Sequence, residues 1–272
     1  MRADGPYWDA VGAGAATERR HALWRLHSDA VNSAWLAPRL SAAPVERLLK
    51  TDLFDESVAD GLRPLLVART RVLVGIDVAA SAIATARRRD GRLAGVAADV
   101  RAVPFADGTF DTVVSNSTLD HFPSATDVAA SLRELHRVLR PGGRLLLTLD
   151  NFANPAVAVR NALPFRPLHA AGIVPYHVGW TCGPRRLARL VREAGFAVVE
   201  IGAMMHCPRV VAVAASRIVE RWVSAGVRRR FLAGLMGFER LEGWPTRFVT
   251  GYFVGVVATK GAAAGASAGA NA

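Results

Sequence analysis

Three short apolar runs, each ending at a polar residue, constrain the fold of this chain more than any other feature. They are residues 71–77, 93–99 and 110–115. The runs end at Asp77, at Asp99 and at the pair Ser115–Asn116, and helical patterns separate them. Such alternation is typical of βαβ units on a parallel sheet. Ligands of these sheets bind beyond the carboxyl ends of the strands, so the polar residues predict a ligand-binding edge.

The order and spacing of these motifs resemble class I S-adenosylmethionine-dependent methyltransferases over roughly residues 48–260. Two further motifs belong to the resemblance. Residues 104–111 (PFADGTFD) introduce the third run, and residues 139–144 (LRPGGR) introduce the next apolar strand. The resemblance implies an α/β fold, a Rossmann-like three-layer sandwich with a mostly parallel seven-stranded sheet whose last strand is antiparallel.

The resemblance also implies S-adenosyl-L-methionine as the cofactor and assigns residues to it. Asp77 is expected to hold the two ribose hydroxyls, and Asp99 is expected to lie at the adenine. The other predicted cofactor-binding residues adjoin the strand ends: Val78, Val100, Ser115 and Asn116.

The resemblance divides the chain into three parts. Residues 1–43 form a helical N-terminal segment, which is either a lid over the active site or a packing helix. Residues 44–260 form the Rossmann-like domain, with cap insertions at about 151–180 and 208–244. The Gly/Ala/Ser-rich tail, residues 261–272, is predicted to be disordered.

The loop after the first strand departs from the family pattern. The strand is expected within residues 45–54, followed by a helix at about 57–68. Related enzymes carry glycines in this loop so that the backbone approaches the cofactor closely. Here Asp52, Phe54 and Glu56 stand at those positions, and the first glycine is Gly61.

Two interpretations of the loop follow. In the first, an acid meets the cationic sulfonium or ammonium group of the cofactor. We predict that Asp52 does so and that Lys50 pairs with its carboxylate, while Asp55 and Glu56 cap the next helix. In the second, bulky side chains fill the site, and the protein is a non-catalytic binding or scaffold protein that has lost the cofactor.

His121 is the candidate catalytic residue. Methyl transfer is an in-line displacement that needs positioning of the acceptor and removal of a proton. Imidazole titrates near neutral pH, so His121 is a candidate base toward a hydroxyl, with Asp120 to orient it. A structural histidine is the alternative. Weaker candidates lie in the predicted caps: Tyr176, His177 and His206. The resemblance favours a small or medium-sized acceptor that is methylated on oxygen or nitrogen.

Net charge, cysteine content and apolar segments limit the kinds of partner that this protein is expected to bind. The formal net charge is +11, but no basic block is interleaved with aromatic residues, so nucleic acid is an unlikely partner. The two cysteines, Cys182 and Cys207, fit no metal-ligand spacing and indicate free thiols in a reducing cytoplasm. No transmembrane segment is predicted. The apolar helices within residues 208–238 carry Arg228–Arg230, and they are expected to cover an acceptor, to contact an anionic membrane surface, or to pack on the domain.

Overall fold

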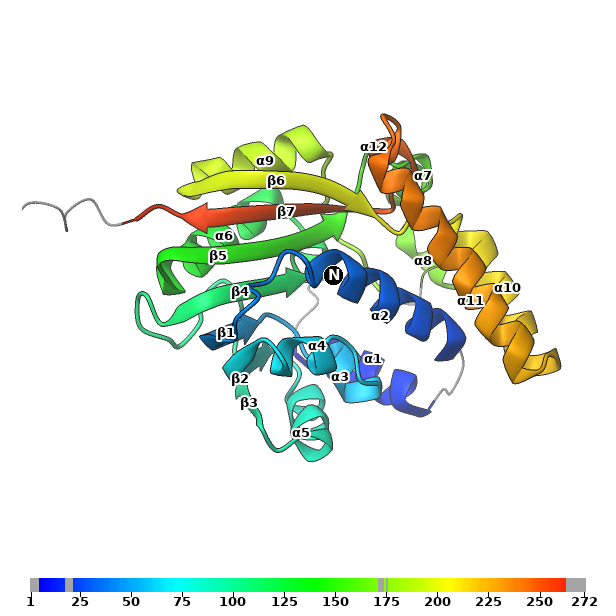
Figure 1. The fold of residues 1–272 in the computed structure, drawn as a ribbon, viewed down its shortest axis with the longest axis horizontal. Coiled ribbons are helices and arrows are strands. Elements are labelled where there is room, and N and C mark those ends of the chain that lie inside the picture. Colours follow the sequence, from blue (N-terminus) through cyan, green and yellow to red (C-terminus); the bar gives the residue numbers. More distant parts are fainter. Residues whose placement is uncertain (1–4, 18–21, 171–173, 175, 263–272) are drawn as a thin grey trace, which may run out of the picture.

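A computed structural model describes residues 5–17, 22–170, 174 and 176–262 (Figure 1). Within them a seven-stranded sheet has the order β3-β2-β1-β4-β5-β7-β6. The strands are β1 Val45–Lys50, β2 Thr70–Asp77, β3 Leu93–Ala97, β4 Phe110–Asn116, β5 Leu139–Asp150, β6 Phe196–Met204 and β7 Phe253–Lys260. Strand β7 is antiparallel to both neighbours, and the other pairs are parallel. The predicted fold class is confirmed.

Helices cover both faces of the sheet. One face packs against α2 (Ala22–Leu36), α4 (Arg63–Val67) and α5 (Ala80–Arg89), and the other packs against α6 (Ala125–Val138) and α9 (Pro184–Glu193). Strand β4 is buried along its whole length because it lies in the middle of these layers.

Ser124 begins α6 by accepting a hydrogen bond from the Asp127 amide at 3.1 Å, which is the capping pair that the sequence indicates.

Further helices gather beyond the carboxyl ends of the parallel strands, and α7, α8, α10, α11 and α12 among them lie on the right of Figure 1. They are α1 Gly5–Thr17, α3 Phe54–Val58, η1 Leu119–His121, α7 Pro155–Ala162, α8 Phe165–Ala170, α10 Arg209–Trp222, α11 Ala225–Gly237, η2 Phe238–Gly243 and α12 Arg247–Thr250. None of the described helices is long and apolar enough to cross a bilayer. The edge predicted to bind ligand is therefore enclosed by helical segments.

Helix α1 lies across the predicted ligand edge. Asp9 Oδ1 accepts a hydrogen bond from the Ser81 amide at 3.0 Å, at the start of α5. The Tyr7 hydroxyl accepts from the His177 amide at 2.7 Å. A Cβ on Gly5 would stand 2.7 Å from the Val78 carbonyl oxygen, so the helix approaches the end of β2 as closely as glycine allows. Such a placement is what a lid requires, and the lid role of this segment stays a prediction.

Several expected elements differ from the observed ones. The helix expected at 57–68 is two short helices, because Gly61 between α3 and α4 has φ of +53° and turns the chain. The first strand ends at Lys50, and the last begins at Phe253 after α12. The insertion 151–180 contains two helices, of which α7 is capped by the Asn154 side chain and begins with Pro155. Residues 263–272 of the predicted tail lie outside the described part.

Candidate active site

A chain of hydroxyl groups joins the ends of β1 and β4. Thr51 Oγ1 donates to Ser115 Oγ at 3.0 Å, and it lies 2.8 Å from Thr118 Oγ1. Thr118 Oγ1 in turn donates to Asp52 Oδ2 at 3.0 Å. The loops that follow the two central strands are thereby fixed relative to each other at the carboxyl edge of the sheet.

The first loop is built around a buried lysine. Lys50 is 1% exposed, and its ammonium group lies 3.3 Å from Asp52 Oδ2 and 2.9 Å from Glu56 Oε2. Its Nζ also donates to the Asp52 carbonyl at 2.8 Å. Burial lowers the pKa of Lys50, but Asp52, Glu56 and Asp55 outweigh it and raise the pKa above the usual value. The predicted contact between Lys50 and Asp52 is present.

Glu56 has a larger structural role than capping a helix. Its carboxylate is buried against Lys50, and its Oε1 accepts from the Leu62 amide at 3.0 Å. Burial raises the pKa of Glu56 to about 7, although Lys50 opposes the shift. Burial and the Asp52 charge raise the pKa of Asp55 to about 6. The sequence indicates an acidic cluster here but not the buried pair of Lys50 with Glu56.

Asp77 is the last residue of β2 at this edge, and its carboxylate holds the first loop by a hydrogen bond. Its Oδ2 accepts from the Leu53 amide and its Oδ1 from the Ala79 amide, both at 2.8 Å. Burial raises the pKa of Asp77, although both amides oppose the shift. Each carboxylate oxygen can accept a second hydrogen bond, so a ribose hydroxyl remains compatible with the arrangement. Val78, which follows, is 38% exposed beneath α1.

Asp99 lies beyond β3 and is held by Arg101. The guanidinium contacts both carboxylate oxygens, with the shortest distance 2.6 Å, and reaches Asp127 of α6 at 2.8 Å. Burial tends to raise the pKa of Asp99, but Arg101 outweighs it and lowers the pKa. Val100, beside it, is 4% exposed in the core. The Arg101 contact was not foreseen from the sequence, although the two residues are only two positions apart.

The side chains of Ser115 and Asn116 are buried and form hydrogen bonds with residues at the ends of neighbouring strands. Ser115 is fully buried and accepts from Thr51, whereas Asn116 Oδ1 accepts from Thr148 Oγ1 on β5 at 2.9 Å. Ser117 follows with φ of +49°, a left-handed conformation that is unusual for a residue with a side chain. This turn redirects the chain into η1, which carries Asp120 and His121.

His121 faces a buried carboxylate. Its Nδ1 lies 3.1 Å from the His177 carbonyl oxygen, and because that oxygen only accepts, Nδ1 carries the proton. The other ring nitrogen, Nε2, is 3.9 Å from Asp120 Oδ1. Asp120 is fully buried, and within the described part of the chain its Oδ1 has no hydrogen-bond partner. Trp8 of α1 packs its ring 4.7 Å from the imidazole.

A polar network lies behind this pair. Asp120 Oδ2 accepts from the Ser117 hydroxyl and from the Asp150 amide, both at 2.9 Å. The Asp150 carboxylate contacts Arg160 at 2.7 Å, and Arg160 donates to the Tyr252 hydroxyl at 2.8 Å. Burial and the Asp120 charge raise the pKa of Asp150, although Arg160 opposes the shift. None of the residues behind Asp120 was a candidate from the sequence.

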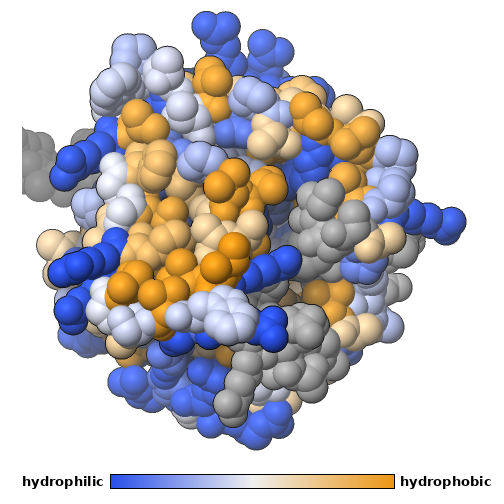
Figure 2. All heavy atoms as spheres, turned by 90° about the vertical axis from the view of Figure 1, so that its right-hand side faces the viewer, coloured by the Kyte–Doolittle hydropathy of each residue, from blue (hydrophilic) through white to orange (hydrophobic). Residues whose placement is uncertain are grey.

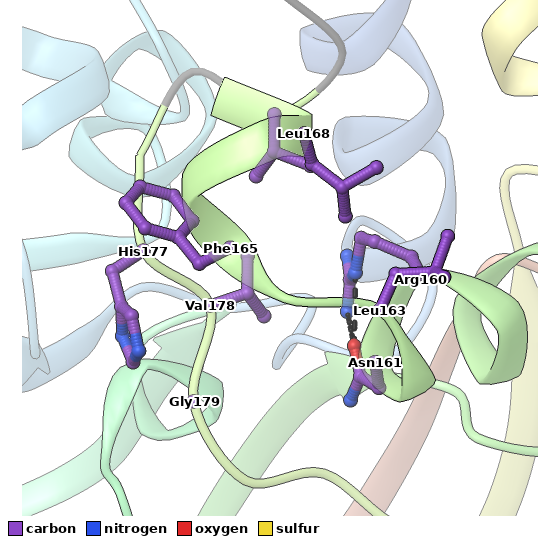
Figure 3. A pocket seen from close by; sticks show the side chains of 9 residues that line it. Arg160, Asn161, Leu163, Phe165, Leu168, His177, Val178 and Gly179 are labelled. Atoms are coloured by element: carbon purple, nitrogen blue, oxygen red, sulfur yellow. Dashed lines mark hydrogen bonds between the residues drawn. The ribbon is translucent and has the colours of Figure 1, made fainter. Parts of the chain in front are cut away.

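An open cleft borders the network (Figure 3). Its volume is about 210 Å³, and it is lined by Arg160, Asn161, Leu163, Phe165, Leu168, Val174, His177, Val178 and Gly179. Figure 3 shows Arg160 and Asn161 of α7 on one side and Phe165 with His177 on the other. The Gly179 amide donates to the Asp120 carbonyl at 2.7 Å, so the wall of the cleft adjoins η1. The weaker candidate His177 is a lining residue.

The remaining weaker candidates occupy different surroundings. Tyr176 packs its ring 5.5 Å from that of His121, and burial raises the pKa of its hydroxyl to about 12. His206 is buried elsewhere, with Nδ1 2.8 Å from Thr250 Oγ1, and its environment is structural. Among the described residues no group of His, Cys, Asp and Glu could hold a metal ion.

Comparison with known proteins agrees with this architecture. Residues 59–147 match a methyltransferase domain family. A demethylmenaquinone methyltransferase of Corynebacterium kroppenstedtii is 34% identical over 44% of this chain and 48% of that protein. A probable S-adenosylmethionine-dependent methyltransferase of Mycobacterium tuberculosis is 28% identical over 64% of this chain and 56% of that protein. The chain therefore spans about half the length of the curated relatives that it matches.

The solved structures extend the likeness to nearly the whole chain. The crystal structure of the [4+2]-cyclase SpnF superimposes with a TM-score of 0.62 at 18% identity and covers 95% of both chains. At this identity the likeness establishes the fold. Together with the match of residues 59–147 to a methyltransferase domain, the fold makes this chain similar to class I S-adenosylmethionine-dependent methyltransferases.

The first loop carries acids and no glycine before Gly61, and its charge is compatible with S-adenosylmethionine. Lys50 is surrounded by Asp52, Asp55 and Glu56, so the loop has a net negative charge when its acids are ionised. The sulfonium and ammonium groups of S-adenosylmethionine are both cationic, and such a field favours them. The Leu53 amide, fixed on Asp77, holds the loop beside the strand end that is expected to bind the ribose.

Proposed function

We propose that this protein is an S-adenosylmethionine-dependent methyltransferase that acts on a small or medium-sized acceptor through an oxygen or nitrogen atom. The observation that carries this proposal is the pair of His121 and Asp120 at the end of β4. The His177 carbonyl oxygen accepts from Nδ1, which leaves Nε2 as the basic nitrogen, and Asp120 Oδ1 lies 3.9 Å from Nε2, where it can stabilise the imidazolium that forms when Nε2 accepts a proton. The acidic first loop lies at the neighbouring strand end.

The cofactor, when bound, supplies a methyl group on a positively charged sulfur that leaves as a neutral thioether. In the proposed site Asp52 faces the methionine portion, Asp77 the ribose and Asp99 the adenine. His121 Nε2 accepts the proton of the acceptor hydroxyl or amine as the new bond to carbon forms. Asp120 then stabilises the charged imidazolium, because its Oδ1 lies 3.9 Å from that nitrogen. The proton leaves to solvent after the transfer.

The cleft beside η1 supports an acceptor that has both apolar and polar parts. Its lining combines leucine, valine and phenylalanine side chains with the polar groups of Arg160, Asn161 and His177. Ligand sites commonly combine such a lining with a few polar groups that fix orientation. Arg160 is held by Asp150 and Tyr252, so it is a fixed polar reference point within the cleft.

A non-catalytic scaffold is the second candidate, and the first loop is the observation in its favour. Leu53 is fully buried over Gly75, where a Cβ would stand 2.5 Å from the leucine side chain. The Leu53 amide also donates a hydrogen bond to Asp77 Oδ2, the carboxylate that is expected to bind the ribose. Fold alone does not decide between the candidates, as the structural likeness to a cyclase illustrates.

Thermal unfolding with and without the cofactor separates the two candidates. An enzyme that binds S-adenosylmethionine must unfold at a higher temperature in its presence, because the ligand binds only the folded state. A hundredfold excess over an ordinary dissociation constant stabilises by about 2.7 kcal/mol. With His121→Gln the shift is expected to remain, because His121 serves the acceptor and not the cofactor. A folded parent with no shift would overturn the enzyme proposal in favour of the scaffold.

A further inference from the structure

The helical hairpin of α10 and α11 presents an apolar stripe to solvent. Three side chains of α10 that share one arc of the helix are largely exposed: Val211 by 67%, Ile218 by 63% and Trp222 by 76%. At 100° per residue they fall within a narrow sector. A different side of α10, roughly 100–140° around the helix and including Ala212 and Ser216, is buried. Figure 2 shows apolar side chains gathered on the side of the molecule where this hairpin lies.

Positive charge borders the stripe. Residues 209–237 contain six arginines and one glutamate. Arg221 lies in the last turn of α10, and Arg229 and Arg230 lie in the first turns of α11, all three exposed. The glutamate, Glu220, accepts from the Leu23 amide of α2 at 2.7 Å, so its carboxylate is directed at the protein. The solvent side of the hairpin therefore combines apolar side chains with positive charge.

We propose that this hairpin docks the protein onto a bilayer surface that contains anionic lipids. An amphipathic helix binds such a surface by inserting its apolar face at the boundary between headgroups and acyl chains. Arginines beside the stripe then meet the lipid phosphates. The Trp222 indole suits the headgroup level because it combines an apolar ring with one donor. The Arg221 guanidinium lies 5.5 Å from that ring, so charge and stripe adjoin.

The charges argue against two other occupants. A second copy docked by the same hairpin would bring two arginine-rich surfaces together, and like charges across an interface are unfavourable. Nucleic acid would satisfy the arginines but would leave Val211 and Ile218 without apolar contacts. An anionic bilayer offers a partner to both parts of the surface.

Vesicle flotation of the full chain tests the proposal without cofactor or acceptor. The parent is expected to float with phosphatidylcholine vesicles that contain phosphatidylglycerol and to remain behind with phosphatidylcholine alone. Added salt should weaken the binding. Arg229→Gln with Arg230→Gln should weaken it about fivefold for each charge removed. Ile218→Ser with Trp222→Ser should abolish it.

The matched control replaces an exposed apolar residue that lies outside the α10–α11 hairpin. Val199 on β6 is 65% exposed, and Val199→Ser should bind vesicles as the parent does. Thermal unfolding of each variant separates lost docking from lost folding. The proposal is overturned if the parent does not bind anionic vesicles or if the Ile218/Trp222 variant binds as tightly. It is also overturned if light scattering finds a dimer of the parent that this variant abolishes, since the stripe then covers a second copy.

Discussion

Lys50 and Glu56 form the most consequential contact at the scale of single residues. Two side chains of opposite charge are enclosed 2.9 Å apart, at the end of the central strand β1. Removing both from water is costly, and their attraction compensates only while both are present. The pair therefore fixes the first loop in one geometry and makes the loop sensitive to loss of either partner.

Lys50→Met should destabilise the protein by about 3–5 kcal/mol at a pH near 8, because it leaves a buried carboxylate without a counter-charge. At that pH Glu56 is ionised in the parent, since its pKa is about 7. Urea unfolding measures the loss. Arg71→Met is the control: its pair with Glu46 is exposed and spans 3.6 Å, so about 0–1 kcal/mol is expected. Equal losses in the two variants would contradict the role given to Lys50.

One contact between residues close in sequence was predicted, one other such contact was missed, and the distant contacts could not be predicted. The pair of Lys50 with Asp52 spans two positions, and opposite charges at the end of one strand made it foreseeable. Arg160 meets Tyr252 across 92 positions, and Asp150 meets Asp120 across 30. Such contacts depend on how the sheet places its strand ends, which no local pattern contains. The roles assigned to Asp52, Asp77, Asp99 and His121 stay predictions.

At the scale of elements, Gly61 decides how the chain leaves the first loop. It stands between α3 and α4 with φ of +53°. A Cβ there would lie 2.7 Å from Glu56 Oε1, the atom that accepts from Leu62. The turn at Gly61 thus separates the two helices and leaves room for the carboxylate that pairs with Lys50.

Gly61→Ala should destabilise the protein by about 1–2 kcal/mol through the left-handed backbone alone, with a further loss from the contact at Glu56. Gly234→Ala in α11 is the matched control, since a Cβ there meets nothing within 4 Å. That variant should be neutral or more stable, by up to about 1 kcal/mol, because alanine favours a helix interior. Urea unfolding of both variants checks the pair, and a Gly61→Ala variant as stable as the parent would refute the account.

Strands and capped helices were predictable because their signals are local. The ends of β2 and β4, together with the capped start of α6, follow from apolar runs, acids and one serine. The helix expected at 57–68 was wrong because its apolar period continues across Gly61, and periodicity does not report a backbone angle. The helices α7 and α8 were missed because prolines at their starts resemble loop signals.

At the scale of the whole molecule, acids from separate elements converge near the predicted cofactor edge. Asp29 of α2 lies near Asp55 and Glu56 of α3, with Lys50 of β1 and Arg25 among them. Burial and Glu56 raise the pKa of Asp29 to about 6. The negative field at the first loop therefore appears only as the pH rises through about 6 to 7.

Affinity for S-adenosylmethionine should consequently increase with pH. Asp29, Asp55 and Glu56 are largely protonated below their raised pKa values of about 6, 6 and 7, and they are ionised above them. A bound cation favours the ionised forms, so an increase of about tenfold is expected for each pKa unit that it lowers. The demethylated product lacks the sulfonium charge and should change less. Calorimetric titration on either side of this range tests the difference, and parallel curves for the two ligands would contradict it.

The central claim is that carboxylates replace glycines in the first loop, and calorimetric titration of Asp52→Asn tests it most directly. This variant keeps the shape and an acceptor for Thr118 while it removes the charge. S-adenosylmethionine should bind roughly ten- to a hundredfold more weakly, as loss of a charge-assisted contact implies. The demethylated product should bind nearly as before. Asp107→Asn, at an 80% exposed side chain, should match the parent. A parent that binds neither ligand, or a variant that binds S-adenosylmethionine as tightly as the parent, would contradict the claim.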